Sequence, residues 1–452
     1  MELPRRTIIK SLVLLFLLLC ATCEVNHALK VSGIFSLANN STANGSNAST
    51  YTVSGSISGL SGNLTATLNT SENLIINSNG TFQFTSTLTS GSSYSVAISD
   101  YPVGQYCSIQ NGTGNISANV TNVLISCQSG NASGPLVGGT VFNALNLNYN
   151  LTTVASGAMY SGINGVTTDG TNIYFTADGN HTILKLIPST NSVSIIGGQS
   201  GISGFADGAA LSATFNLPED LVFLQNILYI TDRNNNAIRA LDLTTNIVST
   251  FVTGVTSPYG ITTDGTYLYL TETGKVSKVN IATATLSVIA GSGVTGYADG
   301  VGATAQFAPQ GSINGGIAFD GTDLYLNDRG NCGIRKVVIS TGAVTTIAGS
   351  PPPTVACGTL LDGIGTASRI NLADGIVSDG TNLYIADTNS CVLRQINMST
   401  LSISTVAGLN GTCALLDGVG TAARLNNPAL MTSDGSTLYI SDWGNNAIRK
   451  MN

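Results

Sequence analysis

One pattern of four short apolar runs returns six times between Asn164 and the C-terminus, and this repetition limits the possible folds more than any other feature. The copy at Gly316–Gly349 reads GIAF, DLYLN, GIRKVV and AVTTIAG, with turn residues such as Asp320-Gly321 between the runs. Short runs rich in Val, Ile, Thr and Tyr, separated in this way, predict a four-stranded antiparallel sheet. One such sheet cannot bury both of its faces alone, so the copies must pack against one another.

The six copies recur at intervals of about 40 to 60 residues, and they begin near Asn164, Glu219, Tyr259, Gly315, Asp374 and Ala429. Recurrence at this spacing, with one sheet per copy, is typical of a β-propeller. The last copy ends after its third strand, and the upstream segment LTTVASG (Leu151–Gly157) has the pattern of a fourth strand. We therefore expect six blades in a ring that this segment closes, because an open ring would expose two sheet edges.

These motifs resemble the NHL repeat family over roughly Leu151 to Asn452. Six copies share the aromatic and aliphatic residues of the second strand, and the fourth strands end in IIGG, VIAG, TIAG and TVAG. The stretch from Tyr51 to Cys127 differs, with about seven short alternating strands that predict a small β-sandwich. Its segments VSGSISGLSGNLTATL and NVLISC resemble the bacterial immunoglobulin-like modules of exported proteins, which implies a spacer. The predicted fold class is all-β, a closed six-bladed propeller preceded by a sandwich.

The first 23 residues combine a basic start, an apolar run too short to span a bilayer, and small residues, which together predict a secretory signal peptide. Cys23 could be acylated as in a bacterial lipoprotein, and simple secretion is the alternative. The predicted organisation is a signal peptide at 1–23, an Asn/Ser-rich tether at 24–50, a sandwich at 51–128, a linker at 129–138 and a propeller at 139–452. We expect a secreted, periplasmic or outer-surface monomer that contacts a membrane only through its signal or a lipid anchor.

Six cysteines follow the signal peptide, and an even number in an exported chain indicates disulfides. Six cysteines allow fifteen pairings. Cys107 and Cys127 lie in the last two strand regions of the sandwich, so they are expected to pair. In a propeller, the turns between second and third strands and the connectors between blades emerge on one face. This placement and the symmetry of the repeat favour Cys332–Cys357 and Cys391–Cys413, with reduced thiols as the alternative.

Acidic and basic residues recur in most copies. An acid closes each second strand and a base follows on the third strand, and these residues are Asp178, Asp232, Glu272, Asp328, Asp387 and Asp442, with Lys185, Arg239, Lys278, Arg335, Arg394 and Arg449. A group present in every blade is expected to serve every blade, so we assign these residues a structural role as turn caps and ion pairs. The connector residues Asp207, Asp299, Asp362 and Asp417 each precede Gly, and we interpret them as turn residues.

Departures from the repeat are the candidate functional residues. The position that opens each innermost strand, at the mouth of the central funnel, carries polar or aromatic residues in four copies: Asn164, Glu219, Tyr259 and Asp374. Just after the recurring acid stand Arg233, Arg329 and the single Trp of the chain, Trp443. Exposed Trp and Arg are common anchors of binding surfaces. A Trp packed on a neighbouring connector is the alternative.

The composition excludes several classes of function. The formal charge is −7 and no Lys/Arg cluster occurs beyond the N-terminus, which excludes electrostatic binding to nucleic acid. The only histidines are His27 and His181, so a His-ligated metal or a Ser/His/Asp triad is not expected. The sequence favours a binding protein for an extracellular or envelope protein, peptide or glycan, with no cofactor. The alternative, implied by the likeness of this architecture to propeller lactonases, is an enzyme holding Ca²⁺ with Asn164, Glu219 and Asp374.

Overall fold

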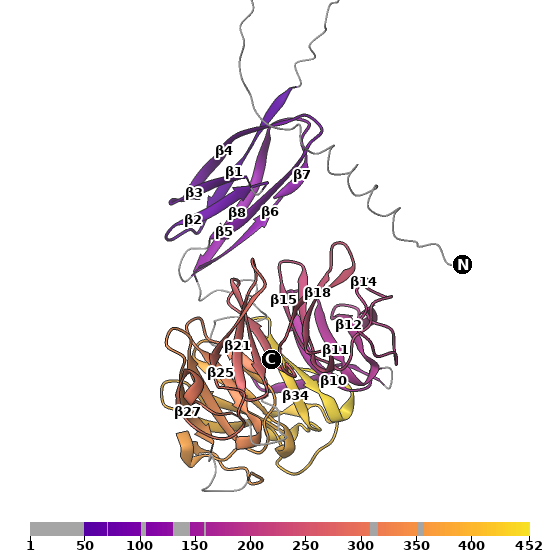
Figure 1. Ribbon diagram of the computed structural model, residues 1–452, viewed down its shortest axis with the longest axis vertical. Coiled ribbons are helices and arrows are strands. Elements are labelled where there is room, and N and C mark those ends of the chain that lie inside the picture. Colours follow the sequence, from indigo (N-terminus) through magenta and orange to yellow (C-terminus); the bar gives the residue numbers. More distant parts are fainter. Residues whose placement is uncertain are drawn as a thin grey trace, which may run out of the picture. The chain divides into compact units, whose positions relative to one another are not determined.

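The computed structural model describes residues 49–69, 71–100, 105–129, 145–157, 160–307, 315–349 and 357–452. These residues form β-strands joined by turns and eight three-residue 3-10 helices, which confirms the predicted all-β class (Figure 1). The predicted signal peptide, Cys23 and most of the predicted tether lie outside the described residues. Within the described ranges, the chain contains no helix that is both long and apolar enough to cross a membrane.

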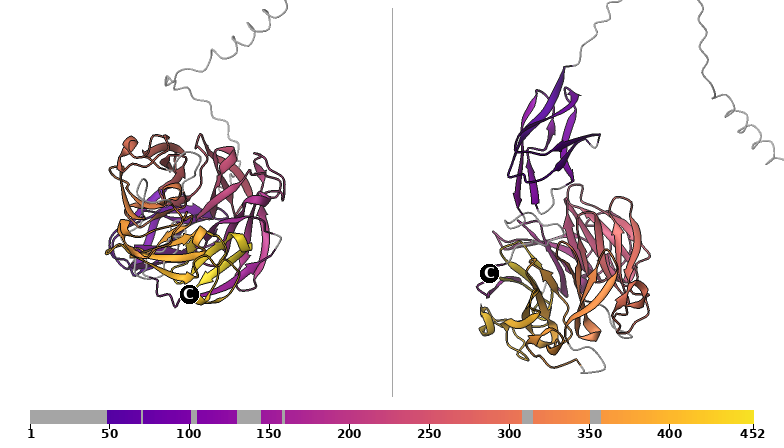
Figure 2. Two further views of the ribbon diagram at one scale, coloured as in Figure 1. Left: turned by 90° about the horizontal axis from the view of Figure 1, so that it is seen from below. Right: turned by 90° about the vertical axis from the view of Figure 1, so that its left-hand side faces the viewer.

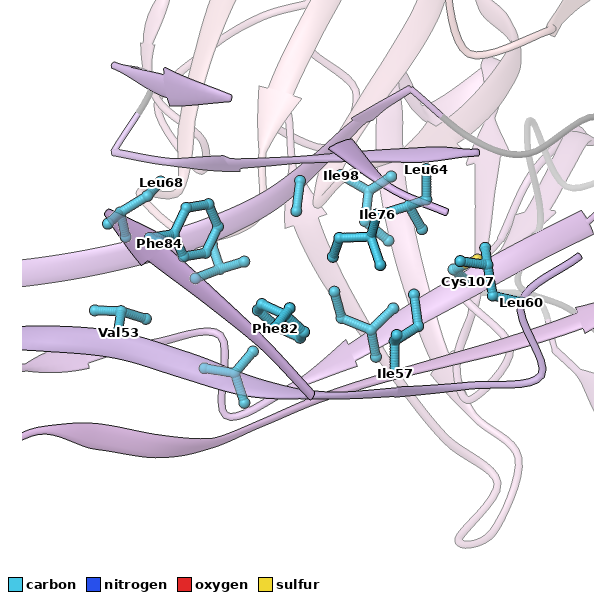
Figure 3. Close-up of a cluster of buried hydrophobic side chains, with 14 of the residues drawn as sticks. Val53, Ile57, Leu60, Leu64, Leu68, Ile76, Phe82, Phe84, Ile98 and Cys107 are labelled. Carbon is cyan, nitrogen blue, oxygen red and sulfur yellow. The ribbon is translucent and has the colours of Figure 1, made fainter. Parts of the chain in front are cut away.

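The N-terminal strands form two four-stranded sheets with the orders β4-β1-β8-β6 and β3-β2-β5-β7. Their bounds are β1 (Thr50–Ser58), β2 (Leu64–Leu68), β3 (Glu72–Ile76), β4 (Gly80–Thr89), β5 (Ser93–Asp100), β6 (Gln105–Gln110), β7 (Thr113–Asn115) and β8 (Val120–Ser129). The predicted strands are all present, and β7 is an additional short one. Alternation places Phe82 and Phe84 of β4 in the core, where the two rings meet edge to face with their centroids 6.0 Å apart (Figure 3).

The predicted disulfide Cys107–Cys127 is present in this sandwich. The two cysteines are directly opposite each other on the paired strands β6 and β8, so the bond joins neighbours within one sheet. Both side chains are buried in the same cluster as Phe84. The likeness to immunoglobulin-like modules stays a prediction.

The rest of the described chain forms six further antiparallel sheets (Figures 1 and 2). From the innermost strand outward, the first three are β10 (Ile163–Thr168), β11 (Ile173–Ala177), β12 (Thr182–Ile187), β13 (Ser192–Gly197); β15 (Pro218–Leu224), β16 (Ile227–Asp232), β17 (Ala237–Asp242), β18 (Ile247–Thr253); and β19 (Ile261–Thr263), β20 (Tyr267–Glu272), β21 (Lys275–Asn280), β22 (Thr285–Ala290). The next three are β24 (Ile317–Phe319), β25 (Leu324–Asp328), β26 (Gly333–Val338), β27 (Ala343–Gly349); β29 (Ile376–Ser378), β30 (Asn382–Asp387), β31 (Val392–Asn397), β32 (Ser402–Gly408); and β34 (Pro428–Ser433), β35 (Leu438–Asp442), β36 (Ala447–Met451), β9 (Asn150–Ser156).

The innermost strands contact one another in chain order, and the last, β34, contacts the first, β10. The sixth sheet takes its fourth strand from upstream of the first copy, since β9 pairs antiparallel with β36 as the sequence predicted. Hydroxyl groups of the second strands link neighbouring sheets: Thr176 donates to the carbonyl of Glu219 at 2.9 Å, and Thr231 donates to that of Tyr259 at 2.8 Å. The first side chains of all the inner strands are thereby brought to one end of a central channel.

The four long connectors each add a fifth, outermost strand to the sheet that follows them. These strands are β14 (Gly208–Ala209), β23 (Gly300–Val301), β28 (Gly363–Ile364) and β33 (Gly418–Val419). A buried arginine of the third strand holds each connector in place, and in the fourth blade this is Arg335. Its guanidinium pairs with Asp328 at 2.6 Å and with Asp299 of the connector at 2.8 Å, and it also donates to two connector carbonyl oxygens. We call this arrangement the arginine clamp.

The clamp recurs around Arg239, Arg394 and Arg449, and all four guanidinium groups are fully buried. This confirms the predicted structural role of the recurring acid and base. The interpretation of the connector aspartates as simple turn residues was incomplete, because Asp207, Asp299, Asp362 and Asp417 are the second carboxylates of the clamps.

Two blades have no clamp, and there the predicted register was wrong. In the first blade, Ala177 and Leu184 occupy the positions that Asp232 and Arg239 occupy in the second blade. Asp178 and Lys185, which were predicted to occupy them, each lie one residue later in the chain. In the third blade the turn is two residues shorter, so Ser277 and not Lys278 is equivalent to Arg239. Both lysines instead lie over tyrosine rings.

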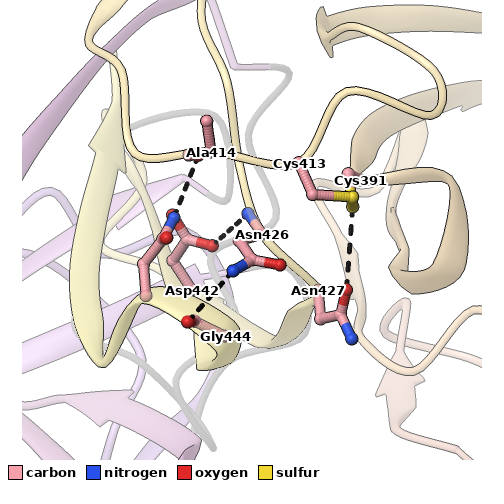
Figure 4. The surroundings of a disulfide bond; sticks show 8 residues. Cys391, Cys413, Ala414, Asn426, Asn427, Asp442 and Gly444 are labelled. Atoms are coloured by element: carbon pink, nitrogen blue, oxygen red, sulfur yellow. Dashed lines mark hydrogen bonds between the residues drawn. A yellow bond between two sulfur atoms is a disulfide. The ribbon is translucent and has the colours of Figure 1, made fainter.

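The disulfides predicted for the propeller are also present. Cys332 pairs with Cys357, and Cys391 pairs with Cys413 (Figure 4). In each pair the first cysteine follows the second strand, and the second cysteine lies in the connector to the next blade. Both bonds therefore fasten a connector to the preceding blade on the face where the channel opens.

Candidate functional site

Six polar side chains converge where the inner strands begin, and we call them the mouth cluster: Asn164, Glu219, Arg233, Tyr259, Arg329 and Asp374. Asn164 and Glu219 lie near the starts of β10 and β15, while Tyr259 and Asp374 lie two residues before β19 and β29. These four residues are buried, with exposed fractions of 3 to 7%. The two arginines come from 3-10 helices that follow second strands, η2 (Arg233–Asn235) and η4 (Arg329–Asn331). All six were candidate binding residues from the sequence, and the structure brings them together.

The first ion pair of the cluster joins Arg233 to Glu219 within the second blade. Nη1 of Arg233 lies 2.7 Å from Oε1 of Glu219, whose side chain is only 4% exposed, whereas the arginine side chain is 28% exposed. The amide nitrogen of Asn164 donates to the other oxygen of Glu219, across the boundary between two blades. The hydroxyl of Tyr259 lies 3.5 Å from the amide oxygen of Asn164. Three consecutive blades thus contribute to one hydrogen-bonded group.

The second ion pair joins the fourth blade to the fifth. Nε of Arg329 lies 2.7 Å from Oδ1 of Asp374, and the arginine side chain is 30% exposed. The backbone N–H of Asp374 donates to the hydroxyl of Thr388, which stands at the repeat position of Arg329 in its own blade. The charge of Arg329 also acts on Glu219, so the two ion pairs belong to one electrostatic unit.

Burial perturbs the acids of this region. Loss of solvent raises the pKa of Asp374 to about 6, although Arg329 opposes the rise. Burial likewise raises the pKa of Glu219, against the opposing effects of Arg233 and Asn164. The pKa of Asp178 rises to about 7 through burial and the nearby charge of Glu219. The mouth therefore contains carboxyl groups that change charge near neutral pH.

Sequence reasoning did not select Asp178 as a site residue. It opens the 3-10 helix η1 (Asp178–Asn180) at the repeat position of Arg233 and Arg329. The signal was available, because the recurring tyrosine of each second strand stands three residues before the recurring acid, and three residues after Tyr174 comes Ala177. Asp178 packs against Gly162. A Cβ atom added to Gly162 would lie 1.7 Å from Oδ1 of Asp178, so a larger residue would not fit there.

Trp443 opens η8 (Trp443–Asn445), again at the repeat position of Arg233 and Arg329. Trp443 is the largest residue at any of these positions, and it is 44% exposed. These 3-10 helices lie beside the connectors, since Asn445 donates to the carbonyl of Ala414 and Asn235 donates to that of Gly204. Trp443 is thus an exposed aromatic group on the face that bears the mouth cluster.

Below the mouth the channel narrows to a cavity of about 30 Å³. Its lining comes from the inner strands and includes Val166, Asp220, Ile261 and Met431. A cavity of this size holds one or two water molecules and no substrate. At the mouth itself, Arg233, Arg329, Trp443 and Asp178 are partly exposed.

The same geometry bears on the alternative of a Ca²⁺ site. Glu219 and Asp374, two of its three predicted ligands, each pair with an arginine. In the part of the chain that the structure describes, no group of three or more His, Cys, Asp or Glu residues is placed to hold a metal ion. A cation between these carboxylates would lie beside two guanidinium charges, which repel it.

Comparisons with known proteins agree with the fold. No protein-family model matches the chain. Over 320 residues it is 25% identical to human NHL repeat-containing protein 2, a match that covers 60% of this chain and 44% of the relative. Over 310 residues it is 24% identical to the chloroplastic protein SUPPRESSOR OF QUENCHING 1 of Arabidopsis thaliana, covering 62% of this chain and 29% of the relative. The chain thus spans less than half the length of either relative.

Solved structures with a similar fold come from Bacteroides species. A protein of unknown function from Bacteroides thetaiotaomicron matches with a TM-score of 0.54 and 13% identity, covering 86% of this chain and 90% of that one. An auxiliary nutrient binding protein from Bacteroides ovatus matches with a TM-score of 0.52 and 15% identity, covering 80% and 94%. At these identities the likeness concerns the fold alone. Together with the repeat-containing relatives, it supports a β-propeller of the NHL type for the C-terminal region of this chain.

Proposed function

We propose that this protein is an exported or cell-surface binding protein, that its propeller holds a ligand at the mouth cluster, and that the sandwich is a spacer. The observation that carries the proposal is a pair of partly exposed arginines, Arg233 and Arg329. Each forms an ion pair with a buried carboxylate. Every member of the cluster departs from the repeat, so the blades do not need these residues for their common structure.

The cluster has the properties of a preorganised binding site. Because Glu219 and Asp374 hold one edge of each guanidinium, a ligand would not have to order two long side chains on binding. Trp443 supplies an exposed aromatic surface on the same face. Three disulfides support a location outside the cytoplasm. The similarity in fold to auxiliary nutrient binding proteins of Bacteroides supports a role in which the propeller captures a ligand from outside.

The test is binding of the purified chain to arrays of glycans and peptides. We expect that the double variant Arg233→Ala/Arg329→Ala loses the signals of the wild type. Lys450→Ala removes a cation from the third strand of the last blade, away from the mouth, and should retain these signals. Signals that survive equally in all three proteins would show that ligands bind elsewhere.

The Ca²⁺-dependent enzyme is tested by metal analysis of the protein purified without chelators. A stoichiometric Ca²⁺ that is lost in the Glu219→Gln variant would replace the proposed function with the enzymatic alternative. We expect no such metal, because Arg233 already neutralises Glu219.

A further inference from the structure

The two arginines of the mouth cluster keep free hydrogen-bond donors. Arg233 pairs through Nη1 and Arg329 pairs through Nε. Among the described residues, no hydrogen bond is made by Nη2 of Arg233 or by either Nη of Arg329. A guanidinium has five N–H donors in a planar fork, and this geometry matches the two oxygens of a carboxylate. Both side chains are about 30% exposed, so these donors are accessible to a ligand.

The charge of the mouth limits which anion can bind. Among the described residues of the mouth, three carboxyl groups, Asp178, Glu219 and Asp374, stand beside two guanidinium groups, so the ionised mouth has no excess of positive charge. A dianionic phosphate group would add twice the repulsion of a monoanionic carboxylate. The mouth therefore favours a carboxylate over a phosphate.

The remaining accessible groups suit a sugar better than a peptide. Trp443 is 44% exposed and offers a flat apolar face on which the C–H face of a sugar ring can stack. The side chain of Asp178 is partly exposed and can accept hydroxyl protons. The four buried residues at the bottom of the mouth are polar or phenolic, and they form no apolar pocket for a peptide side chain.

From these three observations we infer that the ligand is an acidic sugar, and that the free N–H groups of Arg233 and Arg329 bind the carboxylate of a uronic acid residue. This inference rests on the proposed function and specifies the class of ligand. Glu219 and Asp374 act as positioning residues, because they orient the arginines without reaching the sugar.

The experiment is titration calorimetry of the full chain with oligogalacturonate and oligoglucuronate, each compared with its methyl ester. The ester keeps the sugar ring and removes the charge. We expect at least one acid to bind, and its methyl ester to bind about tenfold more weakly or worse. Arg329→Ala should weaken binding of the acid by a similar factor and leave the ester unaffected. Arg329→Lys should lie between, because it keeps the charge and loses the fork.

Three results overturn the inference: no binding of either acid, equal binding of acid and ester, or tighter binding of the corresponding sugar phosphate. The proposed function can survive each of them. If a neutral glycan or a peptide on the arrays loses its signal in Arg233→Ala/Arg329→Ala, the mouth is a binding site and the ligand class is wrong. If no signal depends on these arginines, the proposed function fails as well.

Discussion

The propeller uses arginine–carboxylate pairs in two different ways. In the clamp, Arg335 is fully buried, pairs with two aspartates and donates to two carbonyl oxygens. At the mouth, Arg329 pairs with one carboxylate and is 30% exposed. Both Nη groups of Arg335 have partners within the chain and only its buried Nε has none among the described residues, whereas both Nη groups of Arg329 stay unbonded and partly exposed. The same two residue types therefore serve structure where they recur with the blades and are available for binding where they do not.

The two blades without a clamp explain its purpose. The first blade has Ala177 and Leu184 where the second has Asp232 and Arg239, and neither the first nor the third blade receives a fifth strand. The buried arginine and the long connector are thus present together or absent together, whereas the third blade keeps an acid, Glu272, which pairs with Lys275 instead. The buried arginine is there to hold the connector, because connector carbonyl oxygens and a connector aspartate are its additional partners.

The largest effect is expected for removal of a clamp arginine. Arg335→Ala leaves Asp328 buried without its cation, and such a loss costs about 3–5 kcal/mol of unfolding free energy. Arg329→Ala should cost less, about 1–2 kcal/mol, because the arginine is 30% exposed and Asp374, whose pKa burial raises to about 6, can bind a proton and become neutral. Chemical denaturation of both variants measures the difference. Equal losses would abolish the distinction between clamp and mouth.

The second effect concerns the clamp as a unit. Asp328→Ala/Arg335→Leu copies the residues of the first blade, and we expect it to be more stable than Arg335→Leu alone by about 1–3 kcal/mol, since no charge is left buried and unpaired. Denaturation midpoints of the two variants at one pH provide the measurement. A double variant as unstable as the single one would mean that the connector, and not Asp328, depends most on the arginine.

Much of this arrangement follows from the sequence, and the failures have identifiable causes. The sequence shows the spacing of the repeated segments, and several features depend on that spacing alone. These are the strand pattern, the β9–β36 pairing, the three disulfides and the convergence of Asn164, Glu219 and Asp374. The clamp was missed because the partners of Arg335 include Asp299, 36 residues away, and backbone carbonyl oxygens, which have no residue-specific pattern. The register of the first blade was wrong because Asp178 is an acid close to the expected position and was taken for the recurring one.

A smaller effect is expected for the half-exposed carboxylate of the clamp. Asp299 accepts from Arg335 and from the backbone and hydroxyl of Thr346, yet its side chain is 44% exposed. Asp299→Asn removes the charge where water can compensate, so we expect a loss of about 1 kcal/mol or less, measured by denaturation. The turn variant Asp242→Asn is the control, because this partly exposed carboxylate accepts from the backbone N–H groups of Thr244 and Thr245. A loss as large as that of Arg335→Ala would show that the outer carboxylate, and not buried Asp328, anchors the clamp.

The last effect is a pH dependence and concerns Asp220, a buried carboxyl next to the mouth cluster that pairs with no cation among the described residues. It accepts from the backbone N–H groups of Leu221 and Ile261, and burial raises its pKa to about 7. The folded protein then binds a proton at Asp220 that the unfolded chain has released, between about pH 4 and pH 7, so the unfolding free energy falls as pH rises through this window. Asp220→Asn should reduce the fall in Tm between pH 5 and pH 8 by a few degrees. An unchanged pH profile would mean that Asp220 is ionised throughout, stabilised by its two N–H donors as an arginine stabilises the other carboxylates.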